Sequence, residues 1–99
     1  MRVRYTRPAL ADLESILDYI AVHSPQGAQH ILSRIQVFIG LLAAHPLIGT
    51  RTNDPTIRRL PTLPYPYLIF YEATEDEIII HAVRHTSRAP SSMPGSAGP

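Results

Sequence analysis

The spacing of apolar residues changes once along this chain, from a helical repeat in the first half to strand-like runs in the second. Across residues 9–42, apolar side chains recur every three or four positions, as in helices that bury one face. A hydroxyl residue precedes a proline at Thr6-Arg7-Pro8 and at Ser24-Pro25, which is typical of a capped helix start. The pattern predicts helices from about Pro8 to Val22 and from Pro25 to just before Pro46, joined as an antiparallel hairpin.

The second half contains segments rich in β-branched and aromatic residues, which favour strands. Prolines and polar turn residues separate these segments, and the stretch before them contains no periodicity, so it is expected to be a surface loop. A short alternating segment at the N-terminus predicts one more strand. The expected elements are a strand at 2–6, a loop at 45–56, and strands at 57–60, 67–73 and 77–83, with a bend at 61–66.

This order of elements predicts an α+β fold, in which one mixed sheet packs on a helical hairpin. The buried faces of the helices and of the sheet should share one core. We expect that core to include Ile16, Ile20, Ile35, Phe38, Ile69, Tyr71 and Ile79.

The length of 99 residues suits one domain, which we place at residues 1–88. The remaining segment, 89–99, is rich in Pro, Ser and Gly, and we expect it to be disordered. The chain contains no cysteine, which excludes disulfides and thiol chemistry, and no apolar run is long enough to span a membrane. These features lead us to expect a cytoplasmic protein.

Metal binding and hydrolysis have little support in the sequence. His81 and His85 are four residues apart, but they lie in a predicted strand, where that spacing does not form a paired ligand site. The chain has no Gly-rich phosphate loop and no nucleophile elbow. We therefore expect no metal and no cofactor, and we assign no catalytic residue.

All nine basic residues are arginines, and two groups of them lie at predicted strand ends. One reading is a positive surface that binds an acidic or nucleic-acid partner, because guanidinium groups bind oxygen pairs well. The other reading is that these arginines are solvated, with one of them paired to Asp54 or Glu72. The candidate target-binding residues are Arg58, Arg59, Arg84, His85 and Arg88.

The predicted helices also carry apolar residues away from their main buried faces. A helix that is apolar on two sides is usually covered on both, either by the neighbouring helix or by a partner chain. The candidate partner-binding residues are Tyr19, Val22, His30, Val37 and Leu41.

Several short segments occur in a fixed order over residues 2–88: Tyr5-Thr6, Asp12-Leu13, Pro46 with Gly49, Arg58-Arg59-Leu60, Pro66-Tyr67, Ile69-Phe70-Tyr71 and Val83-Arg84-His85 with Arg88. Their ordered combination resembles the RelE/ParE toxin family of bacterial type II toxin–antitoxin modules. The resemblance implies a strand, two helices and three strands, which agrees with the fold predicted above. It also implies a cognate antitoxin whose flexible segment wraps the toxin.

The family has two activities, and three positions distinguish them here. RelE-like members cleave ribosome-bound mRNA with basic residues and a late tyrosine, whereas this chain has Leu68, Thr86 and Ser92 at the corresponding positions. ParE-like members bind DNA gyrase, and this chain resembles them more in its Val83-Arg84-His85 ending. The resemblance therefore favours a ParE-like gyrase inhibitor without enzyme activity. The alternatives are an mRNA endonuclease and a non-toxic, antitoxin-binding member of the family.

Overall fold

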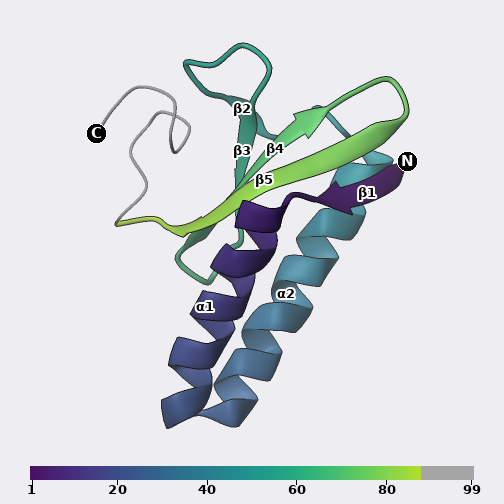
Figure 1. Ribbon diagram of the computed structural model, residues 1–99. Helices are drawn as coiled ribbons and strands as arrows, with labels where there is room; N and C mark the ends of the chain where they lie inside the picture. Colours follow the sequence, from purple (N-terminus) through teal and green to yellow (C-terminus); the bar gives the residue numbers. More distant parts are fainter. Residues whose placement is uncertain (88–99) are drawn as a thin grey trace.

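A computed structural model of the chain describes residues 1–87 and consists of a twisted sheet above a long helical hairpin (Figure 1). The predicted tail at 89–99, together with Arg88, lies outside the described residues. The elements are β1 (Arg2–Tyr5), α1 (Arg7–His23), α2 (Pro25–Ala44), β2 (Thr50–Arg51), β3 (Arg58–Pro61), β4 (Tyr67–Ala73) and β5 (Glu77–His85).

The sheet has five strands in the order β1-β5-β4-β3-β2, so the first and last strands of the sequence are neighbours. β1 pairs parallel to β5, while the strands from β2 to β5 are antiparallel to their neighbours. The α+β prediction is confirmed. The structure adds the two-residue strand β2 within the predicted loop 45–56, where Thr50 pairs with Arg59.

Both helices begin where the sequence predicts them. The Thr6 hydroxyl accepts a hydrogen bond from the Ala9 amide, and the Ser24 hydroxyl accepts one from the Gly27 amide. Thr6 also donates to the Ile80 carbonyl of β5, which fixes the start of α1 against the sheet. The cap residue is therefore also a joint between the two layers.

The main core lies between the sheet and the hairpin, and it contains most of the residues that the sequence predicts for it. Ile35, Ile69 and Tyr71 are buried in this core, and Ile16, Ile20 and Phe38 pack against it. Ile79 was wrongly expected there. Ile78 and Ile80 occupy the core instead, because side chains alternate across a strand and Ile79 points to the other face.

The opposite face of the sheet, called the outer face below, carries a second apolar cluster. It consists of Ile57, Leu68, Phe70 and Ala82. A break in register at Phe70 and Tyr71 leaves His81 as an extra residue in β5. This bulge places His81 beside Ala82 on the outer face, where it meets Glu72.

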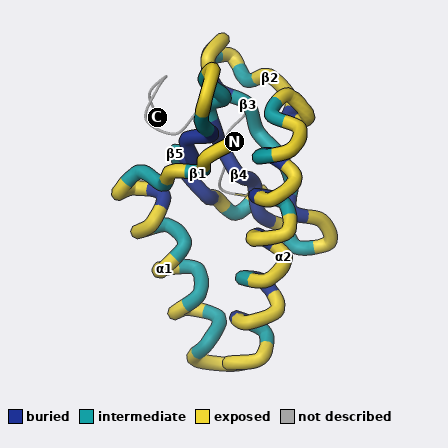
Figure 2. The backbone as a smooth tube through the Cα atoms, turned by 90° about the vertical axis from the view of Figure 1, so that its right-hand side faces the viewer, coloured by how far each residue is buried: buried dark blue, intermediate teal, exposed yellow. Residues whose placement is uncertain are grey.

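The helical hairpin extends well beyond the sheet, and the turn between α1 and α2 lies at its far end (Figure 1). Figure 2 shows that most of α1 and the outer side of α2 are exposed or only half-buried. Within α1, only Ala9 is fully buried. No helix in residues 1–87 is long and apolar enough to cross a membrane.

Candidate functional site

The predicted target-binding arginines do not converge at neighbouring strand ends, because β4 lies between β3 and β5. Since β4 is antiparallel to both, β3 and β5 run in the same direction, and Arg58 begins β3 whereas Arg84 lies near the end of β5. The strand register also places the predicted target-binding residues on two different faces of the sheet. Arg59 and Arg84 lie opposite Phe70 and Leu68, on the outer face, whereas Arg58 and His85 lie opposite Tyr71 and Tyr67, on the helical face.

Arg58 is engaged within the protein. Its guanidinium donates to the Gly49 carbonyl at 2.8 Å and to the Leu47 carbonyl at 3.4 Å. The Tyr71 hydroxyl holds the same loop, since it accepts from the Gly49 amide and donates to the Pro46 carbonyl. Arg58 and Tyr71 therefore hold residues 46–49 against the sheet by hydrogen bonds. In the described residues, the role of Arg58 is to stabilise this loop.

Arg84 is paired with Asp12 of α1, with 3.5 Å between Nε and Oδ2. The same carboxylate oxygen accepts a hydrogen bond from the Val83 amide. β1 ends its pairing with β5 at Ile80, so Asp12 satisfies an amide on the part of β5 that β1 does not cover. Asp12 thus connects α1 to the end of the sheet and restrains Arg84 on the surface.

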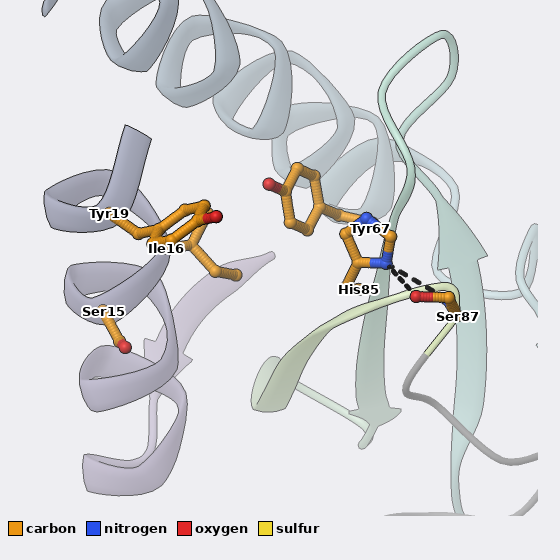
Figure 3. A pocket seen from close by; sticks show the side chains of 6 residues that line it. All are labelled: Ser15, Ile16, Tyr19, Tyr67, His85 and Ser87. Carbon is orange, nitrogen blue, oxygen red and sulfur yellow. Dashed lines mark hydrogen bonds between the residues drawn. The ribbon is translucent and has the colours of Figure 1, made fainter. Parts of the chain in front are cut away.

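His85 and Tyr19, predicted for two different partners, line one cavity between α1 and the ends of β4 and β5 (Figure 3). This α1–β5 cavity has a volume of about 320 Å³, and Ser15, Ile16, Tyr67 and Ser87 also line it. The Tyr67 and His85 rings pack edge to face, with 5.4 Å between their centroids. Burial raises the pKa of the Tyr67 hydroxyl, with a smaller contribution from Tyr19, so the hydroxyl is neutral at physiological pH.

The outer face carries a carboxylate and an imidazole in contact. The His81 Nε2 and Glu72 Oε1 atoms are 3.0 Å apart, and both side chains are partly exposed. Leu68 is buried in the apolar cluster of this face. The face therefore combines a partly exposed acid–base pair with Arg59 and Arg84, around an apolar centre.

His30 and Val37 lie together on α2 in a shallow groove beside the loop that precedes β4. Pro64 and Tyr65 form the other wall, and Arg34 donates to the Leu63 carbonyl across it at 2.8 Å. Leu41 is exposed one turn further along α2, and Val22 is exposed near the end of α1. The predicted partner-binding set is therefore divided between this α2 groove and the outer side of α1.

Residues 1–87 contain no cluster of His, Asp or Glu side chains that could hold a metal ion.

Comparison with known proteins agrees with this architecture. Residues 3–90 match the family described as the ParE toxin of type II toxin–antitoxin system, parDE. The chain belongs to the ParE toxin family. Among the similar proteins, "Toxin RelE2" of Caulobacter vibrioides is 38% identical over 87 residues, covering 88% of this chain and 97% of the relative. "Putative toxin Y4kP" of Sinorhizobium fredii is 32% identical over 79 residues, covering 80% and 82% of the two chains.

Solved structures support the family assignment at the level of the fold. A chain of the chromosomal ParDE system from P. aeruginosa aligns with a TM-score of 0.74 and 26% identity, over 86% of this ParE-family chain and 95% of the other. YafQ from E. coli has a TM-score of 0.60 at 11% identity, over 88% and 96% of the two chains, which shows a shared fold alone.

Sequence reasoning missed three residues that shape these surfaces in this ParE-family toxin: Asp12, Tyr65 and Tyr67. Asp12 could have been noticed as an acid on the edge of an apolar helix face. Tyr65 and Tyr67 lie on either side of Pro66 and face different cavities. The sequence contains no signal for that division, because it depends on the bend between β3 and β4.

Proposed function

We propose that this ParE-family toxin arrests growth by binding DNA gyrase, and that a cognate antitoxin neutralises it. The observation that supports this target most directly is the outer face, where Leu68 belongs to a buried apolar cluster. RNA cleavage of the RelE type would call for a basic group at that position, as the family resemblance implies. The ParE family match agrees with the same choice.

The proposed target surface is smaller than the sequence suggests. Arg59 and Arg84 share the outer face and lie two strand spacings apart across the sheet and two residues apart along it, about 12 Å between their backbones. Arg58 is bonded to the loop, and His85 faces the α1–β5 cavity. Arg88, in the predicted target-binding set, follows the described residues directly. We therefore assign the first contact with an acidic target surface to Arg59 and Arg84.

A supercoiling assay with purified gyrase tests this proposal. The unmodified toxin should inhibit supercoiling, and Arg59→Ala combined with Arg84→Ala should weaken inhibition by at least about tenfold, since hydrogen bonds to charged groups contribute about 1.5–3 kcal/mol each. Arg7→Ala, which removes one exposed arginine at the start of α1, is the control and should inhibit normally. Equal inhibition by the double variant and the control would contradict the proposed surface.

RNA cleavage is the second candidate, and one observation favours it. The Glu72–His81 pair provides a carboxylate and an imidazole in contact on the same face as Arg59 and Arg84, which are groups suited to proton transfer beside a phosphate. The relative from Caulobacter is also named RelE2. Cleavage of ribosome-bound mRNA by the purified chain, lost in His81→Ala, would replace the gyrase proposal.

A further inference from the structure

The α1–β5 cavity is lined by a tyrosine hydroxyl that bonds no other group among residues 1–87. Tyr67 as a whole residue is 8% exposed, but no fully buried side-chain N or O atom in the described chain lacks a partner, so this hydroxyl faces the solvent in the cavity. Figure 3 shows this hydroxyl pointing across the cavity toward Tyr19 of α1. Buried polar groups are normally hydrogen-bonded, so any molecule that displaces water from this cavity must offer a polar atom to Tyr67.

His85 offers a second polar group in the same place. Its Nδ1 atom accepts a hydrogen bond from the Ser87 amide at 3.1 Å and lies 2.7 Å from the Ser87 hydroxyl. Because Nδ1 is an acceptor, the proton of the neutral ring lies on Nε2. The ring therefore has one N–H donor left for an occupant of the cavity.

These groups restrict the chemistry of the occupant. Among residues 1–87, no arginine lines the cavity, which argues against a phosphate group. A purely hydrocarbon side chain would cover the Tyr67 hydroxyl and the His85 N–H without bonding either. A phenol suits both needs, because its ring can pack on Ile16, Tyr19 and Tyr67 while its oxygen accepts one hydrogen bond and donates another.

The surroundings of the cavity favour a protein partner over a free small molecule. Tyr19, which forms its rim, is 75% exposed, and Val22, one turn further along α1, is 79% exposed. Apolar surface thus continues from the cavity along the helix. We propose that a tyrosine side chain of the antitoxin enters the α1–β5 cavity and bonds Tyr67 and His85. This inference rests on the proposed function, because it requires a cognate antitoxin.

The first experiment uses amino-acid probes on the full chain. N-acetyl-tyrosinamide should shift the ¹H–¹⁵N signals of Ser15, Tyr19, His85 and Ser87, and it should bind about 3–10-fold more tightly than N-acetyl-phenylalaninamide, which lacks the hydroxyl. Tyr67→Phe, which removes one of the two bonding groups, should reduce this preference, and Tyr65→Phe, which alters the α2 groove, should leave it unchanged. Equal binding of the two probes to the unmodified chain would overturn the proposal, and so would tighter binding of adenosine or uridine.

The second experiment measures the affinity of the antitoxin encoded beside the toxin gene, with thermal melting as the folding control. Tyr67→Phe should weaken binding about 3–10-fold, and Tyr65→Phe should bind normally. Unchanged binding of folded Tyr67→Phe would overturn the cavity assignment. Gyrase assays are independent of both measurements, so a toxin that ignores gyrase yet shows this Tyr67 dependence would disprove only the proposed target.

Discussion

At the scale of single residues, Gly49 shows how one small side chain allows the loop to contact the sheet. A Cβ atom at Gly49 would lie 2.6 Å from the Tyr71 ring and hydroxyl, and 2.9 Å from the Arg59 carbonyl oxygen. The Tyr71 ring is fully buried in the core, and the carbonyl belongs to β3, so neither can move away freely. The close approach lets the Tyr71 hydroxyl bond both Gly49 and Pro46.

Replacing this glycine should therefore destabilise the fold. We expect Gly49→Ala to lower the free energy of unfolding by about 1–3 kcal/mol, because the added methyl group overpacks the site. Gly40→Ala is the matched control. Nothing lies within 4 Å of a Cβ at Gly40 in α2, so the better helix former should raise the free energy of unfolding by roughly 0.5–1 kcal/mol. Urea denaturation measures both, and equal effects would refute this account of Gly49.

At the scale of elements, α2 has one buried face and one exposed apolar stripe. Ile31, Ile35 and Leu42 face the core, while Val37 and Leu41 stay exposed on the other side. Neither α1 nor the sheet covers this outer stripe, which leaves the partner interpretation of Val37 and Leu41 open and removes the neighbouring helix as an explanation. The α2 groove places Tyr65 and Pro64 beside Val37, so the apolar surface extends onto the loop.

We expect Val37→Asp and Leu41→Asp each to weaken antitoxin binding about tenfold or more, because a desolvated apolar contact would be replaced by a charge. The unbound toxin should melt normally, since both side chains are exposed. Gln36→Asp places the same charge on an exposed neighbouring position of α2 and should bind as the parent does. Titration calorimetry compares the three variants. Equal affinity in all of them would remove α2 from the antitoxin interface.

At the scale of the whole molecule, packing of the sheet on the helices buries three tyrosine side chains, Tyr5, Tyr67 and Tyr71, to different degrees. Burial raises the pKa of the Tyr5, Tyr67 and Tyr71 hydroxyls above their ordinary value, and the Gly49 amide only partly offsets this for Tyr71. A raised pKa in the folded state means that folding favours the neutral phenol. Stability from these groups is therefore complete below a pH of about 10 and is lost as the pH rises further.

Alkaline titration should reveal this coupling. We expect tyrosine absorbance near 295 nm to continue rising above the ordinary pKa, and the melting temperature to fall over the same pH range. Tyr71→Phe should make the loss of stability above pH 10 shallower, because one buried phenol no longer ionises. A melting temperature that stays constant while the tyrosines ionise would contradict the burial of these hydroxyls.

The sequence by itself determined the elements and the family of this protein. Helix starts depend on local hydrogen bonds from Thr6 and Ser24, and helix faces depend on spacing along the chain, so both could be predicted within a residue or two. The core followed from the same spacing. The one residue wrongly predicted for the core, Ile79, lies in a strand. Successive strand residues point to opposite faces of the sheet, so the face of Ile79 depends on the register in which β5 pairs with β1 and β4.

Only the tertiary structure decided which candidate residues meet. The strand order separates Arg58 and Arg59 from Arg84 by one strand, and Arg58 is bound by carbonyls of a loop that the sequence treats as a connector. His85 and Tyr19 come from elements 66 positions apart, yet they share a cavity with Tyr67. Such sites depend on long-range packing between α1 and the sheet. The spacing of residues along the chain predicts helices because the hydrogen bonds of a helix join residues close in sequence. The same spacing contains no information about contacts that form only when distant elements pack together.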